Sequence, residues 1–156
     1  ILNDRGEPIF KGSTDGNGLA AALTNPTELS KRKGNVKQDY PVFFQGVTWP
    51  DAESAYLTLA ASLPHVIKAA SPREDCTHLI EDARDKLMID IIVAKLRQHP
   101  RLGQTVRAKG GVAFLERCEH TTNAKSSRFQ AWEGYGRESR FIRNLIAAYE
   151  RWAVDA

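Results

Sequence analysis

A long amphipathic segment in the second half of the chain constrains the fold more than any other feature. Apolar residues recur there at the spacing of one helix face. The members of this broad stripe are Leu87, Met88, Ile91, Ile92, Ala94 and Leu96. Pro100 follows the pattern and cannot continue it. The segment therefore predicts a helix over residues 82–98 with a wide face turned to a core.

Other segments predict further helices and a small amount of β-structure. Helices are expected over residues 50–62, 64–70, 101–108 and 138–152, another begins at Ser71-Pro72, and 19–24 form a helical turn. Strand patterns cover 8–11, 41–45 and 112–117, and 118–136 read as a polar loop. Residues 1–46 are otherwise irregular. The expected architecture is one α+β domain over 1–156, predominantly helical beyond residue 46.

Composition narrows the class of protein. The 156 residues suit one domain, and no apolar run reaches the roughly 18 residues of a membrane span. Cys76 and Cys118 have no metal-like spacing to a histidine, so we expect no metal, no cofactor and a reducing, cytoplasmic environment. The chain starts at Ile1 rather than Met, and we expect it to be part of something longer.

Positive charge gathers at one place in the first quarter of the chain. The net charge is +3, and a basic cluster comprises Lys31, Arg32, Lys33 and Lys37. One interpretation is a solvated loop. The other is contact with nucleic-acid phosphates, which makes binding fall with salt.

Glu53 is the acid whose neighbours suggest chemistry. With Thr48 as N-cap and Pro50 in the first turn, helical spacing brings Glu53 below Trp49 and close to Tyr56. A carboxylate between aromatic faces suits a nucleotide or a sugar. The alternative is an ordinary first-turn acid that complements the helix macrodipole.

Several short motifs follow one another in a recognisable order. They are Trp49-Pro-x-x-Glu53-x-x-Tyr56, Ala69-Ala-Ser-Pro72, Met88-x5-Ala94-Lys95-Leu-x-Gln98-His99-Pro100-x-Leu102, Trp132-x-Gly134-x-Gly136 and Asn144-Leu145. This set resembles the NADAR (YbiA-like) family over about residues 8–152. The chain departs from the family pattern at Ala60, where a Lys is usual, and at Glu133 and Ile142. It therefore resembles a divergent branch, similar to the antitoxins paired with DarT-type DNA ADP-ribosyltransferase toxins.

The resemblance implies cleavage of the bond between ribose C1 and a base nitrogen. The expected function is a metal-independent glycohydrolase that removes ADP-ribose from guanine in DNA. The alternatives are an N-glycosidase for ribosylamino-pyrimidine intermediates of riboflavin synthesis, and a non-catalytic ADP-ribose or nucleic-acid binding module. The partners implied are ADP-ribosylated DNA or nucleotide, ADP-ribose itself and a DarT-type toxin.

The hydrolysis passes through a positively charged sugar. A carboxylate can stabilise this charge or activate the water that attacks the sugar. Glu53 is the first candidate for this role and Asp51 the second. With Ala60 at the usual Lys position, a Schiff-base route needs Lys33, Lys68 or Lys95 instead. The candidate ligand-binding residues are Trp49, Tyr56, Lys95, Trp132, Gly134, Tyr135, Arg143 and Asn144.

Overall fold

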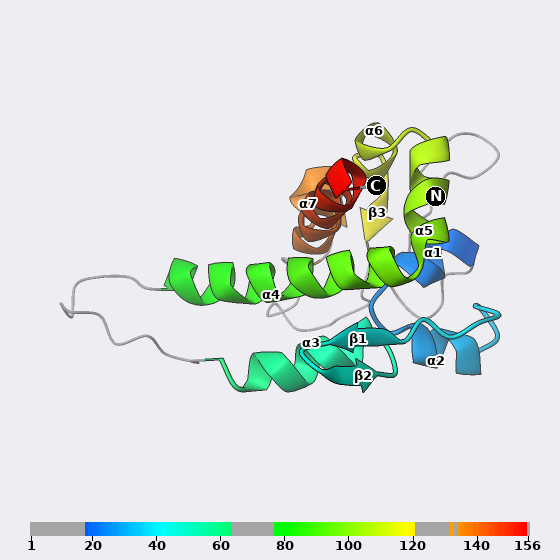
Figure 1. Cartoon of the computed structure of the whole chain (residues 1–156). Coiled ribbons are helices and arrows are strands. Elements are labelled where there is room, and N and C mark those ends of the chain that lie inside the picture. The colour runs from blue at the N-terminus through cyan, green and yellow to red at the C-terminus, as the bar shows by residue number, and fades with distance from the viewer. Residues whose placement is uncertain (1–17, 64–76, 121–131, 133, 156) are drawn as a thin grey trace.

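The computed structural model describes residues 18–63, 77–120, 132 and 134–155. Helix α4 (Thr77–Gln98) crosses the middle of the molecule (Figure 1). On one side of it lie α5 (Pro100–Ala108), α6 (Val112–Leu115) and α7 (Arg140–Asp155). On the other side lie α2 (Thr27–Arg32), α3 (Ala52–Ala61) and a hairpin of β1 (Val42–Phe44) and β2 (Val47–Trp49).

The core has two parts because α4 is buried on two sides. Its Met88, Ile92 and Leu96 pack in the main cluster with the apolar face of α7. Ile91 packs with Val42 of β1 and with Ala52 and Ala55 of α3 in a smaller cluster. The predicted apolar residues of α4 are therefore buried, but they pack on two sides of the helix instead of one. The prediction of a mainly helical α+β fold is confirmed.

Short elements complete the described structure. Helix α1 (Gly18–Leu23) precedes α2, and the two-residue turn of the hairpin is Gln45-Gly46, both with positive φ. A second antiparallel pair joins β3 (Glu119–His120) to β4 (Gly134–Tyr135), and the turn η2 (Gly136–Glu138) leads into α7. Within the described residues, no helix combines the length and apolar composition needed to cross a membrane.

The start of α3 differs from the prediction. Thr48 is not an N-cap, because residues 47–49 form β2 and Thr48 pairs with Phe43 across the hairpin. The cap is Asp51, and the helix begins at Ala52. Trp49 is therefore not on the same helix face as Glu53. Its indole packs on the smaller core cluster and donates its N–H to the Phe44 carbonyl.

Four other predictions need correction. The apolar run at 112–117 forms the short helix α6 rather than a strand. The polar loop at 118–136 contains β3, β4 and the start of η2. The first part, expected to be irregular apart from the helical turn at 19–24 that α1 matches, also contains α2. Helix α4 begins at Thr77, five residues before the predicted start at 82. The predictions at 8–11, 64–70 and Ser71-Pro72 lie outside the described residues.

Candidate functional site

Asp51 holds two helices at their N-termini. One carboxylate oxygen accepts the Ser54 amide of α3 at 2.8 Å, and the other accepts the Glu28 amide of α2 at 3.0 Å. The side chain is buried, with 4% exposed. Both oxygens of the Asp51 carboxylate are therefore used in holding the first turns of α3 and α2.

Glu53 lies in the first turn of α3, at a half-buried position. Its amide donates to the Asn25 carbonyl at 3.2 Å, which ties this turn to the connection between α1 and α2. Its carboxylate accepts no hydrogen bond from any residue that the structure describes. Burial, followed by repulsion from the Asp51 carboxylate, raises the pKa of Glu53. A carboxylate that is unpaired and unusually basic is suited to accept a proton or face a cation.

Tyr56 connects Glu53 with the rest of the candidate site. It is half-buried, and burial is the main cause of its raised pKa; the charges of Arg140, Arg84, Asp85 and Glu53 also act on its hydroxyl. Its ring meets Trp132 edge to face, with 6.2 Å between the ring centroids. Tyr56, predicted to lie close to Glu53 on α3, therefore also contacts Trp132, which is 76 positions further along the chain.

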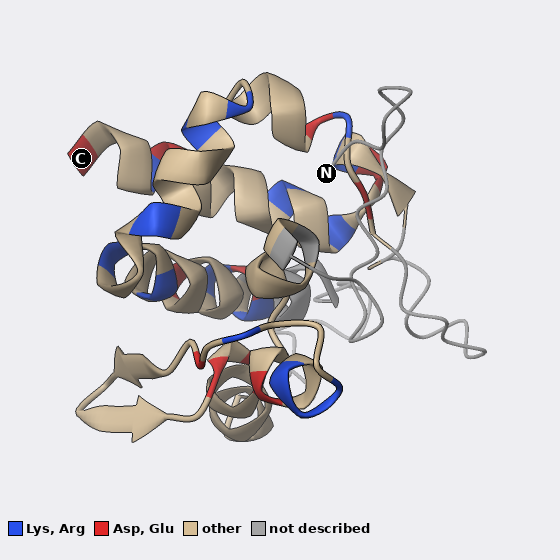
Figure 2. Cartoon of the chain, turned by 90° about the vertical axis from the view of Figure 1, so that its right-hand side faces the viewer, with Lys and Arg blue, Asp and Glu red and all other residues tan. Residues whose placement is uncertain are grey.

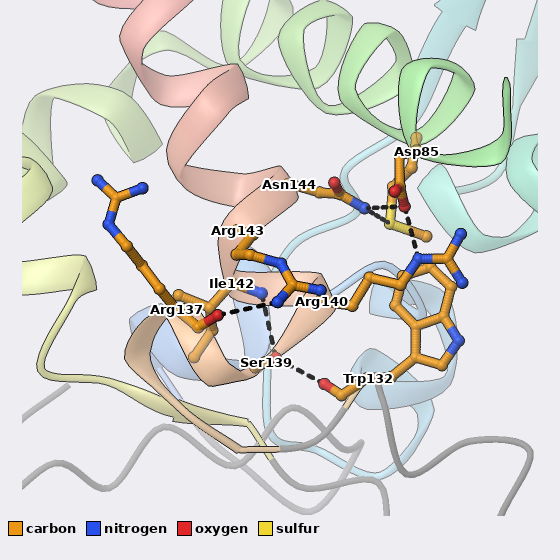
Figure 3. A network of polar contacts seen from close by, with 9 residues as sticks. Asp85, Trp132, Arg137, Ser139, Arg140, Ile142, Arg143 and Asn144 are labelled. Atoms are coloured by element: carbon orange, nitrogen blue, oxygen red, sulfur yellow. Dashed lines mark hydrogen bonds and ion pairs between the residues drawn. The ribbon is translucent and has the colours of Figure 1, made fainter. Parts of the chain in front are cut away.

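Arg140 and Asp85 hold Trp132 from the other helices (Figure 3). The Arg140 guanidinium lies over the indole, 4.2 Å from the ring centroid, and its Nε donates to Asp85 at 2.6 Å. Asn144 donates to the same Asp85 oxygen at 3.1 Å. Ser139 donates its hydroxyl to the Trp132 carbonyl at 2.6 Å. A polar network from α4 and α7 thus fixes an aromatic wall beside Glu53.

The structure brings together four of the predicted site residues and separates others. Tyr56, Trp132 and Asn144 belong to the network described above, and Glu53 precedes Tyr56 by three residues on α3. The Arg143 guanidinium donates instead to the Arg137 carbonyl at 3.2 Å (Figure 3). Tyr135 is exposed on β4, and Gly134, with φ of 136°, packs against the backbone of residues 138–139.

Sequence reasoning missed Asp85, Ser139 and Arg140. Arg140 and Asn144 are four residues apart, so they share a face of α7, and this spacing is the signal that could have identified Arg140. Asp85 carries no comparable signal, because its two partners come from a helix 55 residues away. Trp132, predicted as a ligand-binding residue, is partly buried and also packs against the main core cluster.

The Lys95–Gln98–His99 run joins α4 to the segments that precede it in the chain. Lys95 is fully buried and donates to the carbonyls of Ala22 and Thr24 at 2.6 and 2.7 Å. The Gln98 amide exchanges two hydrogen bonds with the backbone of Phe43. His99 contacts the Pro41 carbonyl through Nε2. Asp90, which precedes Lys95 on the same helix, is bound instead by Arg151 at 2.7 Å.

Burial lowers the pKa of Lys95 from 10.5 to about 7, and the Asp51 charge opposes this effect. Tyr40 is the ring nearest its ammonium, at 5.8 Å. A neutral amine keeps two N–H donors, enough for both carbonyls. In the window from about pH 7 to pH 10 the unfolded chain therefore binds more protons at this residue than the folded chain does.

We expect Lys95→Met to remove this proton linkage. The difference between the free energies of unfolding, wild type minus variant, should increase as pH rises from about 7 to 9, by at most about 1.4 kcal/mol per pH unit. Urea unfolding at several pH values measures the difference. Lys86→Met, at an exposed position of α4, is the control and should follow the wild type. A constant difference between wild type and Lys95→Met would contradict the lowered pKa.

The basic cluster lies on α2 and the segment after it, where Figure 2 shows Lys and Arg grouped. Lys31 and Arg32 form the last turn of α2, and Lys33 is its C-cap, so the first part of the cluster is helical rather than a loop. All four side chains are exposed. Lys31 is paired with Asp39 at 3.0 Å.

The described residues contain no group of His, Cys, Asp and Glu able to hold a metal ion. Comparison with models of known protein families, with curated proteins and with solved structures finds no match.

Proposed function

We propose that the chain is an N-glycoside hydrolase that removes ADP-ribose from guanine bases in DNA, opposing a DarT-type transferase. The observation that carries the proposal is Glu53: a half-buried, unusually basic carboxylate with no hydrogen-bond donor among the described residues, beside the Tyr56–Trp132 pair. The resemblance of the ordered motifs to the NADAR family supplies the substrate class.

The residues support a simple division of labour. As the bond from ribose C1 to the base nitrogen breaks, positive charge develops on the sugar and the Glu53 carboxylate stabilises it. The same carboxylate takes the proton of the water whose oxygen adds to C1, and that proton passes to the departing base nitrogen, so that ADP-ribose and guanine are released. Tyr56 and Trp132 offer aromatic surface to a base or to adenine, and Asp85 and Asn144 keep that surface in place.

A non-catalytic ADP-ribose binding module is the second candidate. It is favoured by Ala60, which is buried and stands where the family usually has a Lys. Lys95 does not replace that Lys freely, because its ammonium is bound to two backbone carbonyls. Lys33 is exposed at the end of α2, and Lys68 lies outside the described residues.

One experiment separates the two candidates. The protein is incubated with an oligonucleotide carrying ADP-ribose on a guanine, and the products are read by mass spectrometry. We expect loss of the ADP-ribose mass from the oligonucleotide and the appearance of free ADP-ribose. Retention of an intact substrate that nevertheless binds the protein would identify a binding module.

We expect replacement of Lys31, Arg32 and Lys33 by Ala to weaken binding of the modified oligonucleotide. The slope of log K against log salt should fall by an amount that corresponds to roughly three phosphate contacts. The contribution of Lys31 should be smaller than that of the other two, because Asp39 already pairs with it. Hydrolysis of a modified free nucleotide should be unchanged. Binding titrations at increasing salt, with both substrates, measure the effect.

The charge-matched control replaces three exposed cations elsewhere, Lys86, Arg97 and Arg151. It should leave the salt slope nearly unchanged. An equal loss on both substrates in the first variant would mean that the basic cluster serves the reacting centre instead.

A further inference from the structure

A hollow of about 890 Å³ opens between the segment after α2 and the start of α5. This volume is within the range of about 300–1,000 Å³ that is usual for ligand pockets. The hollow is not part of the site around Glu53: residues 34–38 with Tyr40 form one wall, residues 98–102 with Thr105 form another, and Leu19 and Ala22 of α1 lie between them.

The lining combines an apolar base with positive charge. Leu19, Val36 and Leu102 provide apolar surface, and Lys37 and Arg101 are the charged side chains together with the titratable His99. The lining includes no carboxylate. Neither Lys37 nor Arg101 has an ion-pair partner among the described residues, although five other cations of the described chain do. An unpaired positive rim around an apolar base favours an anion that carries an apolar group.

Tyr40 supplies an aromatic wall that is held in place. Its half-buried ring meets His99 edge to face at 5.1 Å, and the Lys95 ammonium lies 5.8 Å from its centroid. His99 is in turn held at 2.8 Å by the Pro41 carbonyl. A ring fixed in this way loses little freedom when a flat group packs on it, which is the role aromatic side chains play in binding unpaired bases.

We infer that this hollow binds one nucleotide of a single-stranded nucleic acid, with the base against Tyr40 and the flanking phosphates at Lys37 and Arg101. A strand is favoured over a free nucleotide because the positive charge continues past the hollow: Gly34 lines it, and the exposed Arg32 and Lys33 come immediately before. An unpaired strand is favoured over a duplex because a stacked base pair offers no free face to Tyr40. This binding does not require the chemistry at Glu53.

The test is fluorescence anisotropy of an unmodified single-stranded oligonucleotide over a range of salt. Replacing Lys37 and Arg101 together by Ala should weaken binding and lower the salt slope by about 1.4, which is about 0.7 for each lost contact. Replacing Arg97 and Arg151 removes the same charge from exposed, ion-paired positions and should change the slope by less than half as much. Equal changes in both double variants would overturn the assignment.

Tyr40→Leu keeps an apolar side chain but removes the ring, and should weaken single-strand binding at least about fivefold. Its unfolding midpoint is measured on the same sample, so that a loss of fold is not counted as a loss of binding. If Tyr40→Leu does not fold, the exposed Lys37 and Arg101 variant still decides the question. Binding of a mononucleotide or a duplex as tight as that of the single strand would contradict the inference.

Discussion

Glu53→Gln is expected to lower the rate of ADP-ribose release by at least about 100-fold, the usual scale for loss of one catalytic acid–base group. Gln is nearly isosteric and keeps the backbone hydrogen bond to Asn25, so the fold and substrate binding should persist. The neutral amide neither stabilises the sugar cation nor accepts a proton from water. The measurement is single-turnover release from a modified oligonucleotide, with binding titrated on the same variant.

The pH dependence gives a second readout of the same residue. Because the pKa of Glu53 is raised, the acid limb of the wild-type rate profile should lie above the usual value of 4.5. Below its pKa the carboxyl is protonated and inactive, so the rate should rise with pH through that limb. A Glu53→Gln rate within about threefold of the wild type would remove this residue from the mechanism.

Asp51→Ala is expected to lower the free energy of unfolding by about 2–4 kcal/mol, since one carboxylate caps two helices and each cap contributes about 1–2 kcal/mol. Asp51→Asn keeps one side-chain oxygen and should lose about half as much. Denaturant unfolding of the two variants beside the wild type measures both values. A loss below about 0.5 kcal/mol for the Ala variant would show that the two caps contribute little.

The Asn variant also tests whether Asp51 takes part in the chemistry. As a positioning residue it should keep hydrolysis within a few-fold of the wild type. Removal of its negative charge should also move the acid limb of the rate profile to lower pH, because Asp51 repulsion raises the pKa of Glu53. A loss as large as that of Glu53→Gln would instead make Asp51 a second catalytic carboxylate.

The longer helices could be predicted from sequence because their signals are local. The periodicity of α4 and α7, and the proline at the start of α5, depend only on neighbours within a few residues. Short segments could not be assigned in this way. The run at 112–117 has too few residues to distinguish a buried strand from a helix, and the backbone of Gly111, with φ of 66°, favours the helical turn that follows.

The candidate site also combines residues that the sequence brings together with residues that only the packing of helices brings together. The spacing of Glu53 and Tyr56 on one helix follows from sequence alone, whereas their meeting with Trp132, Asp85 and Arg140 depends on how α3, α4 and α7 pack. Lys95 makes the contrast sharpest. By sequence it is a charged residue one position from the apolar stripe. In the tertiary structure α4 is covered on two sides, and its Lys95 ammonium is buried against the carbonyls of Ala22 and Thr24 at the end of α1. Only the tertiary structure decides this, because the burial of a side chain depends on which elements cover its helix face.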